Sequence, residues 1–249
     1  MWLADQPIPG SAQAVNDLRS NGYKVVFVTN FSFGTRTEIE KKLERHGVEA
    51  EGSVITSSMA AASLVTARSS AKVVGGPGII DELQRRDVEV VPLESDQKVD
   101  AVVVGMDPQF NYERLRLAAT AVRQGAQLIA TNADPTYPTP NGPVPGGGSM
   151  VAAIATASET TPIIAGKPWA TIAEFVKTLV GETGVMVGDR LDTDGAFAVT
   201  LQWPFALVLS GANAETIDRE MSRGIQPDFV AANLQELVET ALSGRGLAK

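Results

Sequence analysis

The sequence predicts an α/β protein built on a doubly wound, mainly parallel sheet. Short β-branched and apolar runs alternate with helical patterns along the whole chain, which is typical of this class. The strand-like runs are continuously apolar, as in parallel strands that are covered on both faces. We therefore expect successive strands to be joined mainly by right-handed helical crossovers.

The expected elements follow from these runs in order. Strands are expected at residues 24–29, 72–74, 101–104, 127–131, 163–165, 184–187 and 205–209. Helices are expected at residues 11–20, 35–46, 58–67, 79–86, 112–124, 150–158, 170–180, 214–223 and 234–242. Thr35 and Glu38 have the spacing of a capping box, and Gly47 stands where a glycine often ends a helix.

Residues 134–148 interrupt the alternation. The segment is rich in proline and glycine and is too long for an ordinary connection, so we expect a functional or disordered loop. Glycines 146–148 lack the Lys-Ser/Thr ending of a phosphate-binding P-loop and are interpreted as a helix entry.

Composition excludes several classes of protein. A chain of 249 residues with 44% hydrophobic residues can build a sizeable core, as one large domain or two coupled ones. The formal net charge of −8 argues against nucleic acid or an anionic membrane as a partner. The chain has no cysteine and a single histidine, His46, which rules out thiolate chemistry and two-histidine zinc motifs. With no membrane-length apolar run and no signal-peptide pattern, a cytoplasmic location is expected.

Polar residues follow three of the predicted strands, as Thr29-Asn30, Gly166-Lys167-Pro168 and Gly188-Asp189. Ligands of open parallel sheets bind outside the carboxyl ends of the strands. Hydroxyl and amide groups can donate to phosphate oxygens, and the lysine adds a positive charge. Asp189 offers a hard oxygen ligand for Mg²⁺, with two further aspartates, Asp192 and Asp194, close behind it. Together these residues predict a site for a phosphate ester and a magnesium ion.

Each motif also has a plainer interpretation. Thr-Asn and Gly-Lys-Pro are compatible with simple turns, and the aspartate-rich stretch at 188–195 is compatible with a helix cap. A calcium-binding EF-hand loop is rejected there, because Arg190 and Leu201 would fall where acidic ligands are required. The co-occurrence of the three motifs in this order favours the functional interpretation.

With these motifs in this order, the chain resembles the haloacid-dehalogenase (HAD) superfamily. More narrowly, it resembles the class IIA phosphatases, which include the NagD-type, p-nitrophenyl-phosphate, phosphoglycolate and glycerol-3-phosphate phosphatases. The resemblance covers nearly the whole chain, including residues 7–10, 130–134, 145–149 and 188–194. It implies a Rossmann-like HAD core formed by residues 1–69 and 166–249, with an α/β cap domain of residues 70–165 inserted between them.

The resemblance also implies an activity: Mg²⁺-dependent hydrolysis of a small phosphate monoester through an aspartyl-phosphate intermediate. Thr29 and Asn30 would bind the transferring phosphoryl group. Lys167 would neutralise that group, so that Thr29 and Lys167 are the expected catalytic residues. Asp189 would ligate Mg²⁺, and Asp194 would hold a metal-bound water or Lys167.

The cap would select the leaving group. By resemblance, Asn132 and Asp134 would lie near the substrate, and closure of the cap would expel water. The expected partner is a small phosphorylated metabolite, and a homodimer formed through the cap is a family expectation.

Two departures from the family pattern matter. Phe31 stands where the family usually has a second asparagine after Thr-Asn. The family also opens with an apolar strand ending in Asp-x-Asp-Gly, whose aspartates act as nucleophile and general acid/base. Met1, Trp2 and Leu3 align just after that motif, so we expect Met1 to be an internal methionine and the chain as written to be inactive. The alternative is a non-catalytic phosphate-binding or scaffold protein.

Overall fold

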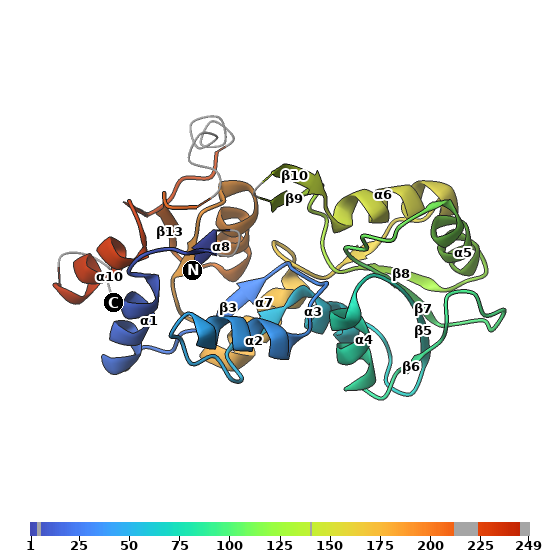
Figure 1. Cartoon of the computed structure of the whole chain (residues 1–249), viewed down its shortest axis with the longest axis horizontal. Helices are drawn as coiled ribbons and strands as arrows, with labels where there is room; N and C mark the ends of the chain where they lie inside the picture. The colour runs from blue at the N-terminus through green and yellow to red at the C-terminus, as the bar shows by residue number, and fades with distance from the viewer. Residues whose placement is uncertain (4–5, 140, 212–223, 245–249) are drawn as a thin grey trace. The chain divides into compact units, whose positions relative to one another are not determined.

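The computed structural model describes residues 1–3, 6–139, 141–211 and 224–244, and it confirms the α/β class (Figure 1). The chain folds into two compact units. The first unit comprises Met1–Phe27, Glu40–Val54 and Ala173–Lys249, and the second comprises Val28–Ile39 and Ile55–Ile172. The core and cap boundaries expected from the resemblance stay a prediction.

The second unit is built on a five-stranded parallel sheet with the order β11-β8-β7-β5-β6. Its strands are β5 (Ser70–Val74), β6 (Glu89–Val90), β7 (Ala101–Val104), β8 (Gln127–Ala130) and β11 (Ile163–Ile164). All four residues of the central strand β7 are buried. This double coverage is why its sequence is continuously apolar.

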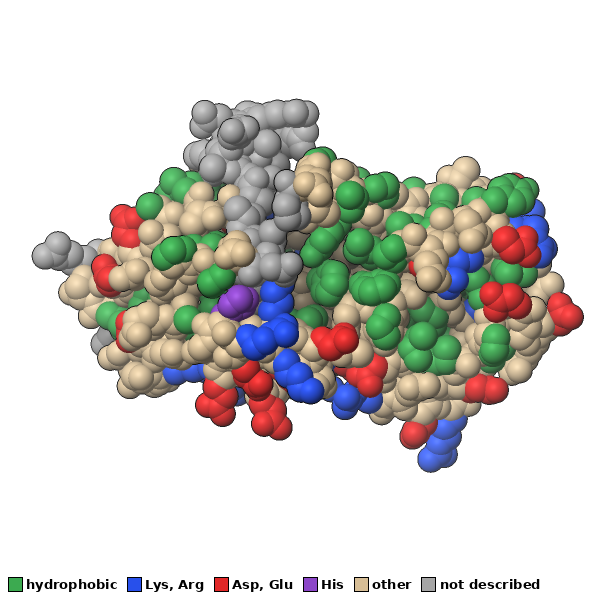
Figure 2. All heavy atoms as spheres, viewed as in Figure 1, with side chains coloured by type: hydrophobic (Ala, Val, Ile, Leu, Met, Phe, Trp, Pro, Cys, Tyr) green, Lys and Arg blue, Asp and Glu red, His purple; other side chains and the backbone are tan. Residues whose placement is uncertain are grey.

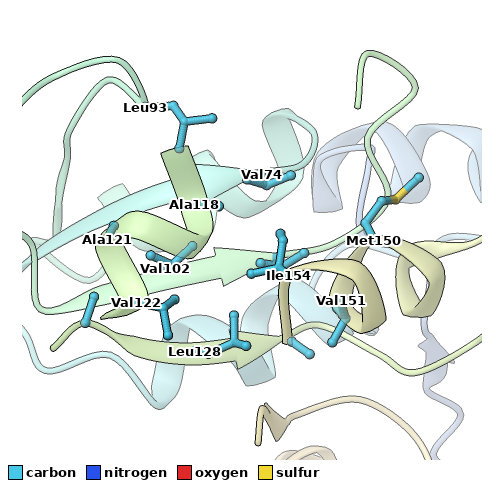
Figure 3. Close-up of a cluster of buried hydrophobic side chains, with 13 residues drawn as sticks. Val74, Leu93, Val102, Ala118, Ala121, Val122, Leu128, Met150, Val151 and Ile154 are labelled. Atoms are coloured by element: carbon cyan, nitrogen blue, oxygen red, sulfur yellow. The ribbon is translucent and has the colours of Figure 1, made fainter. Parts of the chain in front are cut away.

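Helices α5 (Tyr112–Arg123) and α6 (Gly147–Ser158) pack against one face of this sheet (Figure 3). Small side chains on α5, such as Ala118 and Ala121, pack with Val102 and Leu128 of the sheet and with Ile154 of α6. Small residues let a helix approach a sheet closely, and burial of this apolar surface stabilises the unit.

Helix α5 begins at a capped end. The Asn111 side chain accepts a hydrogen bond from the backbone N–H of Arg114 at 3.0 Å. We expect Asn111→Ala to lower the free energy of unfolding by about 1 kcal/mol, because one helical N–H loses its partner. Urea titration measures this, with Asn111→Asp as the control, since aspartate caps equally well. Equal stability of the two variants would show that the cap contributes nothing.

The structure differs from the prediction at residues 134–148. Two strands, β9 (Thr136–Thr139) and β10 (Gly142–Pro145), form an antiparallel hairpin in which Pro138 lies opposite Pro143. Prolines argue against strands in sequence patterns, which is why the segment was predicted to be irregular. Gly146 precedes the first turn of α6, which confirms the helix entry.

The first unit contains a three-stranded parallel sheet, β12 (Met186–Gly188), β13 (Phe205–Val208) and β14 (Phe229–Ala231). Helix α1 (Ser11–Ser20) packs against α10 (Leu234–Leu242). A π-helical turn η1 (Leu191–Gly195) continues into α8 (Ala196–Leu201). Strands β1 (Trp2–Leu3) and β2 (Gln6–Pro7) form a short antiparallel pair. The predicted helix at 214–223 lies outside the described residues.

The remaining elements either lie within the second unit or contain a boundary between the segments of the two units. They are β3 (Phe27–Thr29), paired with β4 (Val54–Thr56), and the helices α2 (Arg36–Arg45), α3 (Ser57–Ser63), α4 (Pro77–Gln84) and α7 (Ala170–Val180). The capping box of α2 is confirmed. The Thr35 N–H donates to Glu38 Oε2 at 2.8 Å, and the Glu38 N–H donates to Thr35 Oγ1 at 3.2 Å.

Acidic and basic side chains lie near one another on the face shown in Figure 2. On α5, the exposed side chains of Arg116 and Glu113, one helical turn apart, form an ion pair. Across the ranges that the structure describes, no helix is long and apolar enough to cross a membrane.

Candidate active site

The side chain of Asn30 is the centre of a polar cluster in the second unit. Asn30 directly follows β3, and its Oδ1 accepts the backbone N–H of Lys167 at 2.8 Å. Its Nδ2 donates to the backbone oxygen of Lys167 at 3.0 Å and to Asp134 Oδ2 at 2.9 Å. One amide group therefore fixes both the loop that carries Lys167 and the carboxylate at the base of the β9–β10 hairpin.

A second amide completes this cluster. Asn132 Nδ2 donates to the backbone oxygen of Asn30 at 2.9 Å and to Asp134 Oδ2 at 3.1 Å. The Ser57 hydroxyl also donates to the Asn30 oxygen at 2.9 Å. The structure thus brings together four residues expected from the sequence: Asn30, Asn132, Asp134 and Lys167. The part of Ser57 was not predicted, because nothing in its local sequence distinguishes it from an ordinary helix start.

These contacts assign different chemistry to the two residues after β3. Both N–H groups of the Asn30 side chain are used, so the side chain holds its neighbours in place. The Thr29 hydroxyl accepts the Phe31 N–H at 3.0 Å. An accepting hydroxyl still has its own proton to donate, so Thr29 can hydrogen-bond a phosphate oxygen.

Lys167 lies where the chain leaves β11, and only 9% of its surface is exposed. The Lys167–Pro168 peptide bond is cis. A Cβ atom added at Gly166 would stand 2.6 Å from Asn30 Oδ1 and would also collide with the Thr131 oxygen. Glycine is therefore required here for the lysine loop to approach Asn30.

Two aspartates expected to bind metal lie in the first unit. Asp189 directly follows β12, and Asp194 lies in η1 and is buried. Asp194 Oδ2 accepts the Arg190 N–H at 3.3 Å. A Cβ at Gly188 would collide with the Asp194 carboxyl, and one at Gly211 with the Asp189 carboxyl. Both carboxylates therefore lie directly against glycine backbone.

Asp192, the third aspartate of this stretch, forms an ion pair with the guanidinium of Arg190. Its carboxyl accepts from Arg190 Nε at 3.0 Å and from a terminal nitrogen of the same guanidinium at 2.8 Å. Burial opposes the charge of Asp192, but these hydrogen bonds outweigh it and hold the pKa of the carboxyl below its usual value. This bidentate contact leaves Asp189 and Asp194 as the candidate ligands.

The remaining donor set is compatible with magnesium. Mg²⁺ prefers oxygen ligands and is usually held by one or two protein carboxylates together with several waters. No group of three or more acidic or histidine side chains placed to hold a metal occurs among the described residues. A pair of aspartates next to small glycines fits an ion that keeps most of its waters.

Comparisons with known proteins agree with this chemistry. Residues 1–89 match the family model for haloacid dehalogenase-like hydrolases, and residues 164–237 match a second model described as HAD-hydrolase-like. Over 268 aligned residues, the chain is 34% identical to phosphoglycolate phosphatase 2 of Arabidopsis thaliana, covering 96% of this chain and 89% of that protein. The chain belongs to the haloacid dehalogenase-like hydrolases.

Solved structures place this HAD-like hydrolase among the class IIA phosphatases. A p-nitrophenyl phosphatase from Archaeoglobus fulgidus superposes with a TM-score of 0.88 at 28% identity, covering 96% of this chain and 95% of that one. A glycerol phosphate phosphatase from Mycobacterium tuberculosis, solved in complex with magnesium, gives a TM-score of 0.83 at 32% identity, covering 94% and 72%. The Rossmann-like α/β fold expected from the sequence is confirmed.

Proposed function

We propose that this HAD-like hydrolase binds small phosphate monoesters and serves their Mg²⁺-dependent hydrolysis to an alcohol and phosphate. The observation that carries the proposal is the Asn30 cluster. It holds the lysine loop and Asp134 beside Thr29, which retains a hydroxyl proton for a phosphate oxygen. A buried lysine next to hydrogen-bond donors is suited to a charged phosphoryl group.

Each residue has a separate part in this proposal. Thr29 donates to the phosphoryl oxygens, Lys167 neutralises their charge, and Asn30 orients the lysine loop. Asp189 and Asp194 would hold Mg²⁺, with Asp194 acting through a water. When bound, the ion would supply positive charge that lowers repulsion between the phosphoryl group and an attacking carboxylate.

Hydrolysis through an aspartyl phosphate needs the family's two opening aspartates. The segment before Pro7 carries no Asp-x-Asp-Gly. The second candidate function is phosphate binding without turnover. A phosphate-release assay with Mg²⁺ separates the two candidates, because turnover above background would show that a nucleophile is present.

The proposal extends to the cap and its surroundings. Residues 70–165 would form the cap, with Asn132 and Asp134 beside the substrate. A homodimer formed through this cap and a cytoplasmic location stay predictions. Sedimentation of the full chain at several concentrations tests the dimer.

Replacement of Asp189 tests the metal site. We expect Asp189→Asn to weaken Mg²⁺ binding by about tenfold or more, since the amide oxygen carries no charge for a hard cation. Calorimetric titration of Mg²⁺ into the parent and the variant measures this effect. Asp17→Asn is the control, because Asp17 lies on α1 and contacts Gln13. Equal affinities of parent and Asp189→Asn would remove Asp189 from the metal site.

A further inference from the structure

An aromatic contact joins the phosphoryl-binding segment to the hairpin. The rings of Phe31 and Tyr137 lie with their centroids 5.6 Å apart and their planes at 34°. This is the range in which aromatic side chains attract one another. Phe31 directly follows Asn30, which bonds Asp134 at the base of the same hairpin. Residues 30–31 therefore hold residues 134–137 through one polar and one aromatic contact.

Val144 extends the apolar surface of Phe31 and Tyr137 to the second strand of the hairpin. Val144 lies directly opposite Tyr137 in the β9–β10 register, so the two side chains point to the same face. Tyr137 is 37% exposed and Val144 is 36% exposed. Phe31, Tyr137 and Val144, which we call the aromatic wall, thus give this part of the second unit an apolar surface that a ligand can reach.

Charge on the hairpin limits what the aromatic wall can bind. Residues 134–145 contain no lysine, arginine or histidine, and their one charged residue is Asp134. A carboxylate on a leaving group would find no positive partner there and would be repelled by Asp134. The side chain of Phe31, which contacts Tyr137, adds an aromatic ring and no polar group to this surface.

We infer that the aromatic wall is the leaving-group subsite. It selects phosphate monoesters whose alcohol is flat, apolar and uncharged, as in aryl phosphates, over esters that carry a carboxylate. The inference rests on the proposed function, because the phosphoryl group must be held by Thr29 and Lys167, with Asn30 orienting the lysine loop. Phe31 and Tyr137 are specificity-determining residues and take no part in bond making or breaking.

Equilibrium binding tests the subsite without requiring turnover. The full chain is titrated with phenyl phosphate, 2-phosphoglycolate and inorganic phosphate, each with Mg²⁺ present. We expect phenyl phosphate to bind roughly two- to tenfold more tightly than 2-phosphoglycolate, the range of one aromatic contact. Phe31→Asn and Phe31→Leu should bring this ratio toward one, whereas Tyr137→Phe should preserve it. Tyr112→Ala, which removes a tyrosine that is 79% exposed on α5, is the matched control.

The outcomes separate the two levels of the proposal. Binding of inorganic phosphate without a preference between the two esters overturns the subsite and leaves the proposed function standing. A preference that survives in both Phe31 variants, each shown to be folded by circular dichroism, also overturns it. Failure of all three compounds to bind overturns the proposed function, and the subsite with it.

Discussion

Replacing Lys167 with methionine is expected to weaken the binding of inorganic phosphate by about 10–100-fold. The Lys167 ammonium, in the second unit, offers a positive charge to the phosphoryl oxygens of the ligand. A hydrogen bond to such a charged group contributes about 1.5–3 kcal/mol to binding. Methionine keeps most of the aliphatic stem, so packing around the buried side chain should change little. Calorimetric titration with phosphate in the presence of Mg²⁺ measures the loss.

The chain offers a matched control for this variant. Lys72 is a second buried lysine of the same unit, 5% exposed, and its Nζ donates to the backbone oxygen of Ser95. Lys72→Met should lower stability, because it leaves that oxygen unpaired, yet it should not change phosphate affinity. If both variants weaken phosphate binding equally, the effect of Lys167 is one of folding and its assignment to the phosphoryl group is wrong.

Asn30→Asp is expected to have the largest effect on stability, about 2–4 kcal/mol of unfolding free energy. The substitution replaces two N–H donors with a carboxylate oxygen, which would face Asp134 Oδ2 and the Lys167 carbonyl oxygen. The Lys167 carbonyl oxygen would lose its donor, at a cost of about 1–3 kcal/mol. Asp134 Oδ2 would keep the donor from Asn132, but repulsion between the two carboxylates adds to the cost. Phosphate affinity should fall as well, since the lysine loop loses its anchor and a negative charge is added.

The pH dependence of this loss distinguishes charge repulsion from altered packing. A proton shared by the two carboxyl groups would restore one donor, so the stability deficit should shrink as pH falls from about 8 to about 5. Urea titrations at both pH values measure it. Asn233→Asp is the control, because Asn233 caps α10 by accepting the Glu236 N–H and aspartate caps equally well. A deficit that is the same at both pH values would contradict the like-charge explanation.

The sequence predicts the fold well where one local rule decides the structure. Helices α1, α7 and α10 and strand β7 have the predicted bounds, because apolar pattern and helix-end chemistry agree there. The β9–β10 hairpin was missed for the opposite reason: its prolines disfavour strands locally, and the tertiary fold overrides them. Residues 24–29 form a strand only from Phe27.

The polar cluster of the site was predicted only in part. The strand-end motifs indicated Asn30 and Lys167, and the family resemblance indicated Asn132 and Asp134. Asn30, however, was expected to use its side chain on the phosphoryl group. In the structure, the side-chain amide of Asn30 donates to Asp134, which is 104 positions away in the chain, and to the backbone oxygen of Lys167, which is 137 positions away. No local pattern encodes a contact of that range, because the orientation of the side chain depends on which loops the fold brings together. The Phe31–Tyr137 contact was missed on the same grounds.

The prolines of the hairpin determine what its open edges can do. Pro138 and Pro143 face each other across β9 and β10. Neither has an N–H, so they form a pair without ladder bonds, and the backbone groups of such a pair point away from the hairpin. Pro145, two residues further along β10, lies opposite Thr136 in a pair of the same type, so its backbone groups also point away from the hairpin. On β10, both outward positions, Pro143 and Pro145, therefore lack an N–H that could donate to an incoming strand, whereas on β9 Pro138 lacks one and Thr136 keeps its own. An open strand edge is a template for pairing with another chain, and the prolines disfavour such pairing between copies along the β10 edge.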